Sequence, residues 1–173
     1  MDAPGERDEG SEPLDVSSVR GNLSLEHVDF SYKPGEPVLR DFNLEVKAGQ
    51  KIAIVGRTGS GKTTIVNLLT RFYETDAGTI KLDGCDIRSI KKSDLRSAIA
   101  IVLQDTVLFS ETIGENIRFG RLTAADEEVR RAAVTAEADP FIERLPQQYD
   151  TPLTESGGNL SQGQRQLLSI ARA

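Results

Sequence analysis

Eight residues in the first half of the chain constrain its fold more than any other feature. Gly56-Arg57-Thr58-Gly59-Ser60-Gly61-Lys62-Thr63 fits the pattern G-x-x-x-x-G-K-[ST]. A short apolar run, 51–55, precedes this loop, and a segment with the composition of a helix, 62–72, follows it. The pattern acts as a phosphate-binding loop when it lies between a buried strand and a helix, which is the context that these flanks predict. The expected fold class is therefore α/β.

Phosphate binding needs each part of this loop. Glycines let backbone N–H groups converge on phosphate oxygens, and the helix that follows adds the positive end of its dipole. The ammonium of Lys62 can reach the β- and γ-phosphates, Thr63 can ligate Mg²⁺, and Thr64 can donate to the α-phosphate. The alternative interpretation is a glycine-rich turn with a surface lysine. The predicted binding residues are Gly56, Thr58, Gly59, Ser60, Gly61, Lys62, Thr63 and Thr64.

Length and charge limit the other possibilities. A chain of 173 residues suits one domain with an appended tail. The longest apolar run, 98–103, is six residues, well short of the roughly 20 that a membrane helix needs. The net charge of −6 argues against nucleic acid as a partner held by bulk charge. Residues 1–20 hold six acids and two bases with few bulky apolar residues, which predicts a linker. From composition alone, a solvated start peptide with no role is the alternative.

Apolar periodicity and turn residues predict the remaining elements. Alternation slips near His27, which indicates a β-bulge, and we interpret this histidine as structural. The runs 51–55 and 99–103 are almost wholly apolar, as in strands buried on both faces of a sheet. Capping boxes at 123–126 and 161–164 open two helices. The expected strands are 23–32, 38–46, 51–55, 78–82 and 99–103, and the expected helices are 62–72, 93–97, 123–138 and 161–173.

A phosphate loop alone does not name the class of protein. A small GTPase should carry N-K-x-D to bind guanine, and the nearest match, Lys91-Lys92-Ser93-Asp94, lacks the asparagine. A small-molecule kinase remains open from the loop alone. The segment Leu160-Ser161-Gln162-Gly163-Gln164 adds a second candidate anion site, because Ser161 can cap a helix and Gly163 permits close approach by a phosphate. By itself, this segment is equally an ordinary capped helix.

Taken in order, these motifs resemble the nucleotide-binding domain of ABC transporters, whose signature L-S-G-G-Q corresponds to L-S-Q-G-Q at 160–164. Tyr32 lies where that family has the aromatic residue that stacks on adenine, although it could be a plain core aromatic. Gln104, in 102–105, matches the glutamine that contacts Mg²⁺ and the attacking water, although it could be a polar residue at a strand end. Segment 108–117 is similar to the exporter segment that faces transmembrane coupling helices, and 154–159 to the exporter loop before the signature.

The resemblance implies a specific architecture. An antiparallel β subdomain would comprise 21–50 with 78–84, and a RecA-like core 51–77 and 85–110. The helical subdomain with the signature helix would comprise 111–173, and 1–20 would be the acidic linker from a transmembrane domain. The strands that follow the signature helix in the family would be missing.

The resemblance also implies a mechanism. Two nucleotide-binding domains pair head to tail, and ATP with Mg²⁺ lies between the phosphate loop of one and the signature of the other. Ser161, Gly163 and Gln164 would then serve the ATP held by the partner domain. Hydrolysis would drive export at the cytoplasmic face of the cell membrane, through the coupling helices of a transmembrane domain. A non-transport ABC ATPase and a module that binds ATP without turnover are the alternatives.

Two departures from the family pattern qualify these expectations. Gln162 replaces the usual glycine, which suits one partner of a heterodimeric exporter but leaves a homodimer open. The sequence stops at Ala173, before the Walker B aspartate, the catalytic glutamate and the switch histidine of the family. We therefore expect a fragment of a longer chain, which binds ATP but hydrolyses it negligibly by itself. The exported substrate is not indicated.

Overall fold

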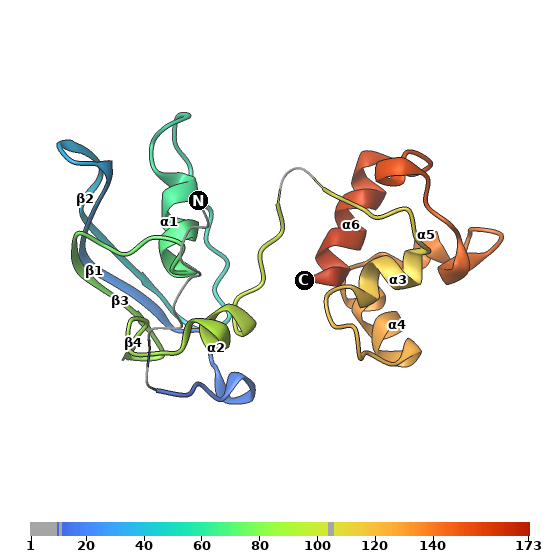
Figure 1. Ribbon diagram of the computed structural model, residues 1–173, viewed down its shortest axis with the longest axis horizontal. Coiled ribbons are helices and arrows are strands. Elements are labelled where there is room, and N and C mark those ends of the chain that lie inside the picture. The colour runs from blue at the N-terminus through green and yellow to red at the C-terminus, as the bar shows by residue number, and fades with distance from the viewer. Residues whose placement is uncertain (1–9, 11, 104–105) are drawn as a thin grey trace, which may run out of the picture. The chain divides into compact units, whose positions relative to one another are not determined.

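The computed structural model describes residues 10, 12–103 and 106–173. The chain divides into two compact units, Met1–Ile99 and Ala100–Ala173 (Figure 1). Each unit has a hydrophobic core of its own.

A four-stranded antiparallel sheet forms the frame of the first unit. Its strands are β1 (Leu23–Lys33), β2 (Glu36–Val46), β3 (Ala77–Leu82) and β4 (Cys85–Asp86). Their spatial order is β2-β1-β3-β4, and every ladder pair among the described strands is antiparallel. The strands predicted at 23–32, 38–46 and 78–82 are confirmed, with β2 beginning two residues earlier than expected.

The predicted bulge in β1 is confirmed at His27. This residue has φ of 51°, and the pairing of β1 with β2 shifts register between Leu25 and Val28. The backbone N–H of His27 donates to Oδ1 of Asn43 at 2.9 Å, and its Nδ1 lies 2.6 Å from Oδ1 of Asp41. His27 therefore has the structural role expected for it. It does not lie on an edge strand as expected, because β1 pairs with β2 on one side and with β3 on the other.

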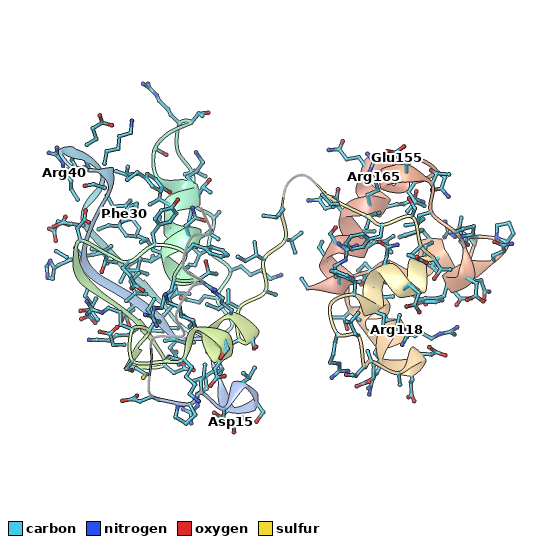
Figure 2. The ribbon with its side chains drawn as sticks, viewed as in Figure 1. Asp15, Phe30, Arg40, Arg118, Glu155 and Arg165 are labelled. Carbon is cyan, nitrogen blue, oxygen red and sulfur yellow. The ribbon has the colours of Figure 1, made fainter. Side chains whose placement is uncertain are left out.

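Two helices share the core of this unit with the sheet, α1 (Lys62–Leu69) and α2 (Lys92–Ser97). Figure 2 shows Phe30 between β1 and α1. The buried core comprises Leu25, Val28, Phe30, Leu39, Ile65, Leu68, Ile80, Leu82, Ile87, Ile90 and Leu95. Apolar side chains of the strands, of both helices and of the segment between β4 and α2 meet in this core, which holds α1 against the sheet.

Part of the segment predicted as a linker packs against this unit. Glu12 forms an isolated parallel bridge with Ile90, and the backbone N–H of Leu14 donates to the side chain of Asp94 at 3.1 Å. The short 3₁₀ helix η1 (Val16–Ser18) follows, capped by Asp15. Composition indicated the low apolar content of this segment but not its attachment to the sheet domain.

The two buried strands predicted at 51–55 and 99–103 are not found. Neither run is assigned to a strand, and the exposed fractions of Ile52 and Val55 are 49% and 88%. A strand buried on both faces needs neighbours that take up its backbone N–H and C=O groups. The described strands supply no such neighbours, so the RecA-like part of the predicted fold does not appear as a sheet.

The second unit is helical. Its elements are α3 (Ile113–Arg118), α4 (Asp126–Thr135), α5 (Asp139–Ile142), η2 (Gln148–Asp150), η3 (Glu155–Gly157) and α6 (Gln162–Arg172). The helix predicted at 123–138 is wrong at both ends. Its N-cap is Ala125 rather than Thr123, because the carboxylate of Glu128 accepts the backbone N–H of Ala125 at 3.0 Å.

A buried asparagine joins three segments of this unit. The side chain of Asn116 accepts the backbone N–H of Phe109 at 2.8 Å and donates to the carbonyl oxygens of Phe109 and Thr112 at 3.0 Å. The guanidinium of Arg172 donates to the side-chain oxygen and to the carbonyl oxygen of Asn116, both at 2.9 Å. These bonds fasten the segment before α3 to the last turn of α6.

Within the described ranges, no helix has the length and apolar character that a membrane crossing requires.

The carboxylate of Asp83 closes the loop before β1. It accepts the backbone N–H groups of Arg20, Gly21 and Asn22 at 2.7–3.2 Å, and the side-chain amide of Asn22 at 2.8 Å. Desolvation acts to raise the pKa of Asp83, but these hydrogen bonds outweigh it and lower the pKa to about 2. The ionised form is therefore the one that the folded state stabilises.

We expect Asp83→Asn to lower the free energy of unfolding at about pH 7 by roughly 1 kcal/mol, a small value because water competes for this exposed carboxylate. Asparagine tolerates the left-handed backbone of residue 83, where φ is 49°. Since the pKa of Asp83 is depressed in the folded state, the wild type is more stable than the variant by the full amount above about pH 4. This difference in the free energy of unfolding is lost as the pH falls toward 2. Urea unfolding across this range measures the difference, and a difference independent of pH would contradict the assignment.

Gly78 lies opposite the bulge of β1. Its φ is 81°, and a Cβ atom there would lie 2.5 Å from the carbonyl oxygen of Glu26. Gly84 has a similar φ of 85° but nothing within 4 Å of its Cβ position. We expect Gly84→Ala to cost roughly 1–2 kcal/mol through backbone strain alone, and Gly78→Ala to cost about 1–3 kcal/mol more. Denaturant midpoints of the two variants measure their losses of stability. Equal losses would show that the close contact at residue 78 adds nothing to the cost of the substitution.

Candidate functional site

The amino end of α1 forms the first candidate site. Gly61 is the N-cap residue, with φ of 85°, and glycine has no side chain with which to cap the helix. The first backbone N–H groups of a helix have no partner within the helix. The amino end of α1 therefore offers N–H groups and a positive dipole end to an anion, as predicted for this loop.

Packing against β2 fixes the position of Gly61. A Cβ atom at residue 61 would lie 3.0 Å from Cδ2 of Leu39 and 3.2 Å from Cγ1 of Val38. Leu39 is buried in the core of the first unit. Glycine is therefore required here by its backbone conformation and by the close approach of β2.

The side chain of Lys62 folds back over the loop. Its Nζ donates to the carbonyl oxygens of Gly56 and Arg57, both at 2.8 Å. The loop itself is tightened by a hydrogen bond from the N–H of Ser60 to the carbonyl oxygen of Arg57 at 3.1 Å. The ammonium is thus held beside the loop of predicted binding residues, among which Thr58, Gly59 and Thr63 are exposed.

Tyr32, the predicted base-stacking residue, lies against the same helix. Its hydroxyl is 3.1 Å from Oγ1 of Thr64, which is 4% exposed. Its ring meets the rings of Phe30 and Tyr73 edge-on, with centroids 4.8 and 5.0 Å away. The exposed fraction of Tyr32 is 46%. The alternative of a plain core aromatic does not match this exposure, because a large part of Tyr32 faces solvent.

The second candidate site lies at the amino end of α6. Ser161 is the N-cap, its hydroxyl accepts the N–H of Gln164 at 3.2 Å, and the side chain of Gln164 accepts the N–H of Ser161 at 2.9 Å. The predicted capping box is thereby confirmed. Gly163 is exposed, and nothing lies within 4 Å of its Cβ position. The packing of this chain therefore gives no reason for glycine at residue 163.

The loop before α6 is held in place by Arg165. Its guanidinium donates to the carbonyl oxygen of Leu160 at 3.2 Å and to that of Gly157 at 3.5 Å. Figure 2 shows Arg165 and the neighbouring Glu155 at one end of the helical unit. The side chain of Asn159 closes the loop by accepting the N–H of Thr154 at 3.2 Å.

The predicted site residues fall into two groups. Tyr32 and the residues of the phosphate loop come together in the first unit, and Ser161, Gly163 and Gln164 come together in the second. Gln104, predicted to contact Mg²⁺ and water, lies outside the described residues. A groove of about 660 Å³ on the sheet is lined by residues of β1 and β2 with Lys81 and Gly84, and it contains none of the predicted site residues.

Sequence reasoning missed one residue of the first site. The side-chain amide of Asn67 donates to the hydroxyl of Tyr32 at 3.3 Å. The helical spacing of Thr64 and Asn67 was the available signal, because residues three apart share one face of a helix.

The sequence matches a known family. The family model described as ABC transporter matches residues 39–173. Among curated relatives, the uncharacterized ABC transporter ATP-binding protein YfiC of Bacillus subtilis (strain 168) is 49% identical over all of this chain and 29% of that protein. The fatty acid ABC transporter ATP-binding/permease protein of Mycobacterium bovis is 47% identical over all of this chain and 28% of that protein.

A solved structure is similar as well. The structure of a bacterial Atm1-family ABC exporter with ATP bound superimposes with a TM-score of 0.78 at 41% sequence identity, over 94% of this chain and 30% of that one. The chain thus spans less than a third of the length of these relatives. Since the family match extends over more than half of its residues, this chain belongs to the ABC transporter family.

Proposed function

We propose that this chain is the ATP-binding part of an ABC exporter, which couples ATP binding and hydrolysis to transport across a membrane. The observation that carries the proposal is the amino end of α1. There a glycine-capped helix start, Lys62 and the exposed ring of Tyr32 lie within one unit. An anion site beside an exposed aromatic ring suits a phosphate ester attached to a flat base.

The phosphates would bind at the start of α1. The ammonium of Lys62 would exchange its two backbone carbonyl partners for phosphate oxygens, which form stronger, charge-assisted hydrogen bonds. The exposed hydroxyl of Thr63 would ligate Mg²⁺ when the ion is bound. The Mg²⁺ ion neutralises charge on the phosphate oxygens, and we assign Gln104 to the same ion.

The amino end of α6 would serve a second ATP, held by another nucleotide-binding domain. A hydroxyl has one hydrogen to donate and two lone pairs. Since Ser161 only accepts in its capping box, its O–H is available for a phosphate. Gly163 leaves the surface open to close approach. These features support a head-to-tail pair of domains, with either a second copy or a different subunit as the partner.

An exposed aromatic surface in the second unit supports coupling to a membrane domain. The ring centroids of Phe109 and Phe119 are 4.4 Å apart, and the exposed fractions of the two residues are 38% and 54%. The guanidinium of Arg172 lies over both rings in cation–π contacts. The relative from Mycobacterium bovis is named an ATP-binding/permease protein. We place the domain at the cytoplasmic face of the membrane, against coupling helices of such a permease.

Nucleotide binding tests the proposal directly. We expect Lys62→Ala to weaken Mg²⁺-ATP binding by at least about tenfold, because the variant loses the ammonium that meets the phosphates. Isothermal titration calorimetry measures this change. Lys51→Ala is the matched control, since it removes the same charge before the loop. Unchanged ATP affinity in folded Lys62→Ala would contradict the proposed site.

The ring of Tyr32 generates a separate expectation. Stacking on an aromatic ring is tolerant of the base and contributes roughly 1–3 kcal/mol. We therefore expect Tyr32→Ala to weaken ATP and GTP binding by similar factors, and the wild type to discriminate only weakly between them. Competition between the two nucleotides measures this preference. A strong preference for GTP would point to a different recognition mode.

A further inference from the structure

The hydroxyl of Tyr32 contacts two side chains of α1. It lies 3.1 Å from Oγ1 of Thr64, and Nδ2 of Asn67 donates to it at 3.3 Å. Thr64 and Asn67 are on one face of the helix because they are three residues apart. One tyrosine of β1 is thus tethered at two points to the helix that carries the phosphate loop.

The two hydrogen bonds of this tether are chemically compatible. The amide nitrogen of Asn67 only donates, so the oxygen of Tyr32 accepts from it. Either hydroxyl of the Tyr32–Thr64 pair can be the donor. In both arrangements the Tyr32 oxygen keeps a lone pair for the amide of Asn67, so the two hydrogen bonds can exist together.

Packing alone leaves the ring of Tyr32 weakly fixed. Its two aromatic neighbours, Phe30 and Tyr73, meet it edge-on, and nearly half of its surface is exposed. Tyr73 is itself 46% exposed. The hydrogen bonds at the hydroxyl are therefore the contacts that set where the ring stands relative to α1.

We propose that Asn67 is a positioning residue for the nucleotide base, acting through the hydroxyl of Tyr32. This inference rests on the proposed function, since it assigns a base to the ring of Tyr32. Asn67 holds the ring at a set distance from the phosphate loop before the ligand arrives. A base attached to bound phosphates then meets a ring that is already in place, and less ordering is needed on binding.

The test compares ATP with inorganic tripolyphosphate, which carries the phosphates without a base. The variants are Asn67→Leu, Tyr32→Phe and the double variant, all in the 173-residue chain. Leucine is similar in size to asparagine and favours a helix more, so folding is not at risk from propensity. Val66→Leu, which introduces the same side chain at the adjacent residue, is the matched control.

We expect Asn67→Leu to weaken ATP binding about fivefold, the effect of one neutral hydrogen bond, and to leave tripolyphosphate binding unchanged. In the Tyr32→Phe background, Asn67→Leu should have no further effect, because the two residues act through one hydroxyl. Val66→Leu should bind both probes as the wild type does. Calorimetry gives the affinities, and thermal unfolding checks that each variant is folded.

Four results would overturn the inference while leaving the proposed function in place. The first three are unchanged ATP affinity in Asn67→Leu, equal weakening of ATP and tripolyphosphate, and an effect that adds fully to that of Tyr32→Phe. An equal loss of ATP binding in Val66→Leu would overturn it too, since the loss would then not depend on the tether. A wild-type chain that binds neither probe would instead overturn the proposed function, and this inference with it.

Discussion

The contact of β2 with the start of α1 is the constraint on which the first site depends. Val38 and Leu39 approach Gly61 where a side chain would otherwise stand, so β2 lies this close to the start of α1 because residue 61 has no Cβ atom. This close approach places the start of the helix beside the sheet. Tyr32, on the neighbouring strand β1, then reaches Thr64 across the same gap. The loop and the aromatic ring are therefore positioned by one packing contact, although 24 residues separate Tyr32 from the start of the loop at Gly56.

Local signals predicted the parts of the fold that depend on local interactions. The bulge at His27 was visible as a slip in alternation, because a bulge adds one residue to a period of two. The capping box of Ser161 and Gln164 was visible because its partners are three residues apart. The same reasoning failed at Thr123, where three acids follow closely, at 126–128. The carboxylate of Glu128, not the position of Asp126, decides where α4 begins.

Elements that depend on distant partners could not be predicted in the same way. The apolar runs 51–55 and 99–103 have the composition of buried strands, but a strand forms only when neighbours take up its hydrogen bonds. Composition also missed the attachment of Glu12 to Ile90, since those residues pair through the backbone. Of the first site, the loop was predictable from its pattern. Asn67 was not identified, because its partner Tyr32 lies on another element.

The hydrogen bonds of Asn116 have a structural consequence for the helical unit. One side chain holds the backbone of Phe109 and the guanidinium of Arg172, which ends α6. The same guanidinium also holds the carbonyl oxygen of Val107 at 2.8 Å. Phe109 is thus joined by hydrogen bonds to the carboxyl end of α6, the helix whose amino end is capped by Ser161. Loss of the Asn116 amide would therefore release both the segment that carries the exposed ring of Phe109 and the last turn of α6.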